Sequence, residues 1–178
     1  MVQKLKNIAG LLGAVPLLNA NAQIAAHIES AFAALPSCVA AVAADQTHSI
    51  AIADSSDVLG SAFDGKATDD GFIVLSRPAV DKWLILHELG HEVAIRFDLA
   101  HGSEFVQALR ADFRSLGARE REQLAYFLRP DEAFAELFAA LYDREDIAAR
   151  DPQIMWLART LSLEKSMLDG LEGCGQSK

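Results

Sequence analysis

The chain has 178 residues, of which 51% are hydrophobic and 23% are charged, so it is long and apolar enough for one domain with a packed core. The formal net charge is -9, from 16 basic and 25 acidic residues. This excess of acid argues against a non-specific nucleic-acid binder, which needs Lys and Arg to meet phosphates. No apolar run approaches the roughly 20 residues of a membrane span. We therefore expect no nucleic-acid partner and no stable membrane insertion.

The first 22 residues permit two interpretations. Two lysines precede an apolar stretch over residues 8–18, and Ala20 and Ala22 give the small-x-small pattern that signal peptidases accept. Residues 1–22 are therefore a candidate signal peptide, and its removal would leave residues 23–178 as a secreted or periplasmic protein. The alternative is an ordinary N-terminal helix whose apolar face covers the core, in a cytoplasmic protein.

The expected secondary structure places strands before helices. A first segment with helical spacing ends at Pro36, and short runs rich in Val, Ile and Ala then favour strands. The expected elements, in chain order, are a helix over 23–35, strands over Cys38–Ala43 and Ser49–Ala53, a loop over 54–71, a strand over Gly71–Ser76, and helices over about 79–96, 102–116, 118–128, 131–143 and 152–169. Strands followed by helices indicate an α+β fold with a small sheet.

The most informative segment is the His-Glu-x-x-His pattern of residues 87–91, which lies in an apolar helical stretch. Residues four apart on a helix share a face, so His87 and His91 can direct imidazole nitrogens at one metal ion. Glu88 lies at the edge of this face, where it can reach a metal-activated water without being a ligand. These polar groups would be costly on a buried helix without a partner, and a zinc ion supplies one. The alternative is a helix that happens to carry two histidines.

A catalytic zinc ion needs a third protein ligand and one open position. A third histidine six residues after His91 is excluded, because Phe97 occupies that position. Asp98 is one candidate ligand. The better candidate lies downstream, where Glu132 and Glu136 are four apart on a mostly apolar helix. This spacing favours Glu132 as the third ligand and Glu136 as an acceptor that orients a ligand imidazole, unless both acids simply face water.

Three segments together resemble a known family. The motif HELGH, the downstream Ser103-Glu104-Phe105 and the sequence PDEAFAELFAALY over residues 130–142 are similar to the anthrax-lethal-factor-like zinc metallopeptidases. These are gluzincins, and the secreted Pro-Pro endopeptidases belong to the same group. The resemblance covers about residues 70–143. HELGH is widespread among zincins, whereas the Glu-x-Phe-Ala-Glu segment at this distance narrows the choice.

The resemblance implies a zincin-like metallopeptidase domain over residues 23–178 with one zinc ion per chain. Transferred residue by residue, it implies His87, His91 and Glu132 as ligands, Glu136 in the surrounding shell, and Glu88 as general base. It also implies that the hydroxyl of Tyr126 assists at the oxyanion, although the interval to Glu132 is about one residue shorter than in relatives and Tyr126 can instead be a core tyrosine. Zincin folds use an exposed edge strand before the metal helix to pair with substrate, which here implies Phe72, Ile73, Val74 and Leu75.

The expected function is therefore peptide-bond hydrolysis by a monomeric zinc metalloendopeptidase that acts on protein or peptide substrates. Two rival interpretations stay open. One is an inactive, zinc-stabilised binding module, although a structural zinc site has no need of a general base such as Glu88. The other is a zinc hydrolase of another clan with Asp98 as a ligand. In an exported protein Cys38 and Cys174 could form a disulfide that stabilises by up to about 4–5 kcal/mol, whereas in the cytosol they would remain thiols.

Overall fold

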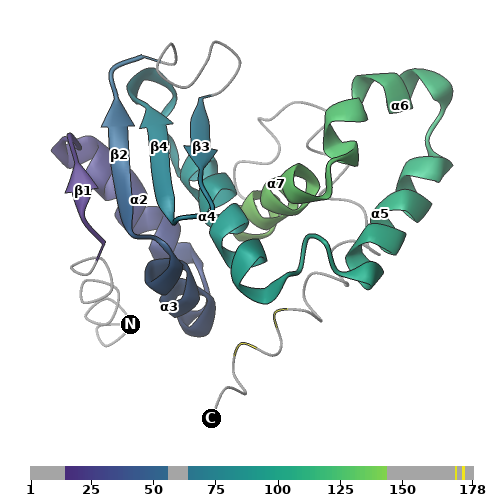
Figure 1. Ribbon diagram of the computed structural model, residues 1–178. Coiled ribbons are helices and arrows are strands. Elements are labelled where there is room, and N and C mark those ends of the chain that lie inside the picture. Colours follow the sequence, from purple (N-terminus) through teal and green to yellow (C-terminus); the bar gives the residue numbers. More distant parts are fainter. Residues whose placement is uncertain (1–14, 56–63, 144–170, 172–173, 175–178) are drawn as a thin grey trace.

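The computed structural model describes residues 15–55, 64–143, 171 and 174, which form an α+β fold with a small mixed sheet and mostly helical content (Figure 1). The strands are β1 (Leu17–Leu18), β2 (Ser49–Ala53), β3 (Gly65–Ala67) and β4 (Phe72–Ser76). The helices are α2 (Ala22–Ala34), α3 (Ser37–Gln46), α4 (Lys82–Phe97), α5 (Ser103–Ser115), α6 (Ala118–Gln123) and α7 (Pro130–Tyr142), with 3-10 turns at Arg77–Ala79 and Ala125–Leu128.

The sheet has the strand order β1-β2-β4-β3. β2 is parallel to both β1 and β4, whereas β3 runs antiparallel to β4. In the register of β2 and β4, Ile50 pairs with Ile73 and Ile52 with Leu75, and all four side chains are buried. They alternate along their strands, as one apolar face of a pleated sheet requires. α2 and α4 pack against each other behind this sheet (Figure 1).

Two expectations about the sheet are wrong. The segment Cys38–Ala43 is not a strand but part of helix α3, because Val39, Ala40 and Ala43 face the core at helical spacing and alanine favours helix. The expected loop over 54–71 contains the three-residue strand β3. The strands expected over Ser49–Ala53 and Gly71–Ser76 are confirmed, and the second begins one residue later than expected, at Phe72.

The position of β4 in the sheet corrects a functional expectation. β4 contains Phe72, Ile73, Val74 and Leu75, and it lies between β2 and β3 with hydrogen-bonded neighbours on both sides. The prediction that this strand is an exposed edge for substrate is therefore wrong. The edge strand at this end of the sheet is β3, which also contacts α4.

The helical expectations that fall on described residues are confirmed with changed boundaries. α2, α5 and α7 correspond closely to the expected helices, and α4 begins at Lys82, three residues later than expected. The expected helix over 118–128 is divided into α6 and a 3-10 turn. The helix expected over 152–169 lies outside the described residues. Of the helices in the described ranges, none is both long and apolar enough to cross a membrane.

The described part of the N-terminal segment belongs to the fold. Leu17 and Leu18 pair with Ile50 and Ala51 as β1. Residues 1–14, which contain most of the candidate signal peptide, lie outside the described residues.

The cysteines meet in space. Cys38 on α3 and Cys174 are half-buried free thiols joined by a side-chain hydrogen bond. Burial and then this hydrogen bond raise the pKa of Cys174 to about 12. The structure thus brings the pair together as thiols and not as a disulfide.

Helix α4 packs on the sheet side of the molecule with α2, α3 and β3, whereas α7 packs with α5. The contact between α4 and α7 is the main one between these two parts. Gly90 of α4 lies directly against α7, where a Cβ would be 3.0 Å from the Cα of Ala135 and 3.1 Å from the Cβ of Phe138. The absence of a side chain therefore allows the helices to approach closely. At one end of the contact, Lys82 Nζ lies 2.6 Å from Asp143 Oδ1 in a partly buried ion pair. This close packing places residues of the two helices around a common site.

Candidate metal site

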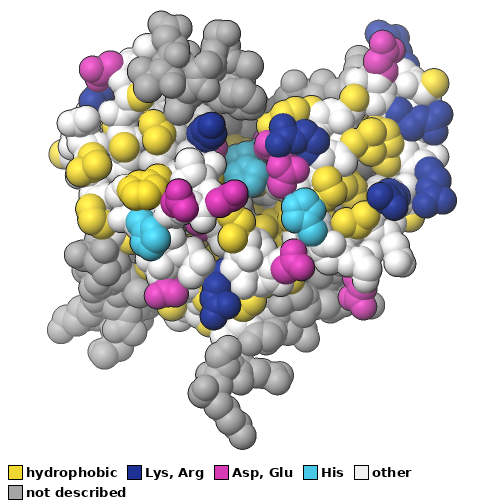
Figure 2. All heavy atoms as spheres, in the orientation of Figure 1, with side chains coloured by type: hydrophobic (Ala, Val, Ile, Leu, Met, Phe, Trp, Pro, Cys, Tyr) yellow, Lys and Arg dark blue, Asp and Glu magenta, His cyan; other side chains and the backbone are white. Residues whose placement is uncertain are grey.

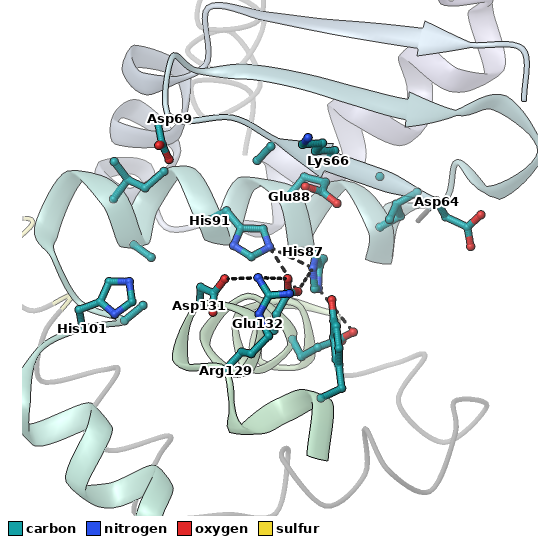
Figure 3. Close-up of a pocket in the computed structure, with 18 of the residues that line it drawn as sticks. Asp64, Lys66, Asp69, His87, Glu88, His91, His101, Arg129, Asp131 and Glu132 are labelled. Carbon is teal, nitrogen blue, oxygen red and sulfur yellow. Dashed lines mark hydrogen bonds and ion pairs between the residues drawn. The ribbon is translucent and has the colours of Figure 1, made fainter. Parts of the chain in front are cut away.

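Helix α4 carries the two histidines of the His-Glu-x-x-His motif. The helix begins after Asp81, whose side chain accepts a hydrogen bond from the backbone N–H of Leu84 at 2.8 Å. It ends at Phe97, and the following residue, Asp98, adopts a left-handed backbone conformation with φ 51°. Within these limits His87 and His91 share the face of α4 that is turned toward α7 (Figure 3).

Glu132 completes a group of three potential metal ligands with His87 and His91, which we call the metal group. His91 Nε2 lies 3.2 Å from His87 Nε2. Glu132 Oε2 lies 3.5 Å from His87 Nε2 and 3.7 Å from His91 Nε2. The three side chains converge from α4 and α7 (Figure 3). Within the described ranges, this is the group of His, Cys, Asp and Glu side chains that is arranged to hold a metal ion. His87, His91 and Glu132 can therefore bind a metal, as expected from the sequence.

The position of Glu132 follows from the start of α7. Pro130 occupies the first turn of the helix, where a missing N–H costs nothing, and Glu132 follows in the same turn, where the helix dipole favours a negative charge. Arg129 Nη2 lies 3.4 Å from the other oxygen of this carboxylate, Oε1. One oxygen of Glu132 thus faces the histidines and the other faces an arginine.

The charges of the group depend strongly on one another. Burial lowers the pKa of His87, but hydrogen bonds with Glu132 and Glu136 outweigh burial and raise the pKa to about 10. Burial raises the pKa of Glu132, but hydrogen bonds with His87, His91 and Tyr126 outweigh it and hold that pKa well below its usual range. The metal-free group is thus an ion pair, in which a divalent cation can take the place of the imidazole proton.

A further carboxylate supports His87 from the opposite side of its ring. Glu136 Oε1 lies 3.5 Å from His87 Nδ1. The indole Nε1 of Trp83 donates a hydrogen bond to Glu136 Oε2 at 3.0 Å. The expected contact between Glu136 and a ligand imidazole is therefore present, and Trp83 is a partner that the sequence pattern did not reveal.

Glu88 lies next to the histidines but points toward β3. It is 3% exposed, its carboxylate accepts a backbone hydrogen bond from Ala67, and its Oε2 has no hydrogen-bond partner within the described part of the chain. Burial raises the pKa of Glu88. A Cβ at Gly65 would collide with Glu88 Oε1, so the glycine leaves room for the carboxylate in its present position. Strand β3 therefore both holds Glu88 and makes space for it.

Glu92, one residue after His91, is a second buried acid on α4. It is 2% exposed, and its Oε1 finds no hydrogen-bond partner among the described residues. Burial, and then the charges of Glu88 and Asp69, raise the pKa of Glu92 to about 7. Neither the sequence motif nor the metal group assigns it a role.

The metal group opens into a cavity of about 630 Å³. Histidine and acidic side chains gather around a hollow between the sheet-bearing and the helical parts of the molecule (Figure 2). The wall is formed by β3, α4, the 3-10 turn before α7, and α7 itself. It includes Asp64, Gly65, Lys66, Ala67, Trp83, Leu84, Tyr126 and Arg129. The residues of β4 are not among those that line the cavity, so an extended ligand would meet β3 first.

Tyr126 and Asp98 both reach this cavity, but in different roles. The hydroxyl of Tyr126 hydrogen-bonds to Glu132, and burial together with this contact raises its pKa. The side chain is 44% exposed, so Tyr126 belongs to the site and is not a core tyrosine. Asp98 lies at the end of α4 and is not a member of the three-residue metal group. The geometry therefore favours Glu132 over Asp98 as the third ligand.

Several residues of the site carry no local signal in the sequence. Gly65 and Ala67 lie in a stretch that resembles a loop, Trp83 resembles an ordinary core residue, and Arg129 resembles a surface residue. They reach the site only through the pairing of β3 with β4 and the packing of α4 on α7. Comparisons of the chain with protein-family models, with curated proteins and with solved structures find no match.

Proposed function

We propose that the chain is a zinc-dependent metalloendopeptidase of the gluzincin class with a zincin-like fold. The observation that carries this proposal is the triangle of ligand atoms. Its three sides, 3.2, 3.5 and 3.7 Å, join two imidazole nitrogens and one carboxylate oxygen. Ligands bound to a tetrahedral zinc ion at about 2.0–2.2 Å are about 3.3–3.6 Å apart. The spacing of the three donor atoms is therefore compatible with zinc.

The donor types support zinc over other divalent ions. Two imidazoles and one carboxylate are typical of catalytic zinc, whereas calcium and magnesium prefer oxygen ligands alone. Held by His87, His91 and Glu132, zinc would supply Lewis acidity that lowers the pKa of water toward about 7 and polarises the scissile carbonyl. The protein contributes the remaining steps through Glu88 and Tyr126.

Glu88 is proposed as the general base. Its carboxylate adjoins the metal group, lines the cavity and has one oxygen without a hydrogen-bond partner in the described structure. In the reaction it takes a proton from the attacking water and hands it to the nitrogen of the leaving amine as the C–N bond breaks. Tyr126 is proposed to donate its hydroxyl hydrogen bond to the oxyanion of the tetrahedral intermediate. In the substrate-free protein the same hydroxyl binds Glu132.

Strand β3 is the proposed docking edge for the substrate backbone. It has β4 on one side, and no other described strand pairs with its second edge, which borders the cavity. An extended peptide can add there as a further strand by main-chain hydrogen bonds. This proposal replaces the expectation that Phe72–Leu75 binds the substrate.

The test combines metal analysis with a peptide digest. The purified chain is expected to contain one zinc per molecule and to cleave a peptide library, with products identified by mass spectrometry. Glu88→Gln is the matched control, expected to keep zinc and to lose turnover, because only the base is removed. Zinc without cleavage in the parent would favour an inactive binding module. Equal cleavage by Glu88→Gln and the parent would disprove the mechanism.

A further inference from the structure

Trp83 is buried next to the metal group, and the proposed reaction does not use this side chain. It lies in the first turn of α4, one turn before His87, and it is 4% exposed. Its indole N–H donates a hydrogen bond to Glu136 Oε2 at 3.0 Å, while Glu136 Oε1 lies 3.5 Å from His87 Nδ1. One carboxylate from α7 is thus held between two residues of α4.

We propose that Trp83 is a positioning residue for the metal ligand His87 and acts through Glu136. The inference rests on the proposed zinc site. An indole has a single N–H donor, so it fixes one oxygen of the carboxylate in one direction. The other oxygen is then directed at His87 Nδ1. A hydrogen bond at Nδ1 fixes the tautomer and the ring plane, so that Nε2 presents its lone pair to the metal.

The arrangement differs from one in which a buried indole simply finds any acceptor. A backbone carbonyl would satisfy the Trp83 N–H equally well. Here the acceptor is a carboxylate whose second oxygen contacts a ligand, and Trp83 and His87 are four residues apart on the same helix. Because rotation of the Glu136 carboxylate would disturb both contacts, removal of the indole donor is expected to loosen His87.

The test is a double-mutant cycle read out as zinc affinity. Trp83→Phe keeps an aromatic ring but removes the donor, and Glu136→Ala removes the intermediary. Zinc affinity is measured by competition with a chromophoric chelator. We expect Glu136→Ala to weaken binding by about 10–100-fold, as is typical of partners of metal-ligating histidines. Trp83→Phe is expected to weaken it by about 10-fold, at the lower end of this range, because it acts one contact further away.

The decisive comparison is the double variant. If Trp83 acts through Glu136, the double variant binds zinc as weakly as Glu136→Ala alone, because the intermediary is already lost. Thermal unfolding of the metal-free forms controls for general destabilisation. This inference alone would be overturned if the effects of the two substitutions on zinc affinity multiplied in the double variant. It would also be overturned if Trp83→Phe bound zinc with the parent's affinity. A parent chain that binds no zinc would overturn the proposed zinc site as well.

Discussion

At the scale of single side chains, the site depends on one oxygen that two imidazoles share. Glu132 Oε2 approaches both histidine nitrogens, whereas its Oε1 is directed at Arg129. Replacement of the Glu132 carboxylate by a neutral group leaves the two imidazoles in a buried site without their anionic partner. A substitution at Glu132 is therefore a test of the ligand set.

We predict that Glu132→Gln lowers zinc affinity by more than about 100-fold, beyond the loss typical of residues that only support ligands. Asp98→Asn is the matched control, because Asp98 lines the same cavity but lies outside the metal group. The measurement is zinc competition with a chelator. Zinc retained by Glu132→Gln but lost by Asp98→Asn would assign the third ligand to Asp98.

The two described tyrosines offer a second comparison at this scale. Tyr126 hydrogen-bonds to Glu132 at the cavity, whereas Tyr142 lies at the end of α7 with its ring 4.8 Å from that of Phe138. We predict that Tyr126→Phe lowers kcat by about 100-fold, as for the loss of one oxyanion donor, with KM little changed. Tyr142→Phe should keep kcat. Steady-state kinetics on one cleaved peptide measures both, and equal rates would remove Tyr126 from the reaction.

At the scale of elements, the short strand β3 fixes the position of Glu88, the proposed general base. Gly65 leaves space for Glu88 Oε1, and Ala67 supplies a backbone hydrogen bond. We predict that Gly65→Ala displaces the Glu88 carboxylate and lowers kcat by about 100-fold or more, because a misplacement of about 1 Å can cost that much. Zinc content should be unchanged, since Glu88 lies outside the group of three potential metal ligands. A variant with full kcat would show that Glu88 does not need its present position.

The contact between α4 and α7 is the second element-scale feature. Gly90 is pressed against backbone and a ring of α7, whereas a Cβ at Gly117 would meet only the flexible end of Glu120 at 3.1 Å. We predict that Gly90→Ala destabilises the protein by about 1–3 kcal/mol through overpacking. The control, Gly117→Ala, should change stability by less than about 1 kcal/mol. Urea unfolding measures both, and equal effects would contradict close packing at Gly90.

These elements also show which features the sequence can reveal. The four-residue spacings of His87 with His91 and of Glu132 with Glu136 are local, so the sequence indicates which side chains share a helix face. Their convergence depends on the packing of α4 on α7, which the spacing alone does not specify. The pattern of Cys38–Ala43 does not distinguish helix from strand, because a short run of Ala and Val fits a buried strand and a helix equally well. No local pattern identifies β3 or places β4 inside the sheet, because strand order depends on pairing between distant segments.

At the scale of the whole molecule, the metal group joins two parts of the chain that are distant in sequence. α4 packs against α2, α3 and β3 on the sheet side and against α7 on the other (Figure 1). The three potential ligands come from both α4 and α7, and they converge only when these helices are packed. An ion bound by all three side chains would therefore stabilise the folded state over the unfolded chain.

We predict that zinc raises the melting temperature of the metal-free protein. At a free zinc concentration of 1,000 times Kd the ion stabilises by about 4 kcal/mol, which corresponds to about 8–16 °C for a chain of this size. Differential scanning calorimetry with and without zinc measures the shift, and a chelator should reverse it. Glu132→Gln and His91→Ala should show little shift, because each lacks one ligand. A shift of equal size in these variants would mean that zinc binds elsewhere on the chain.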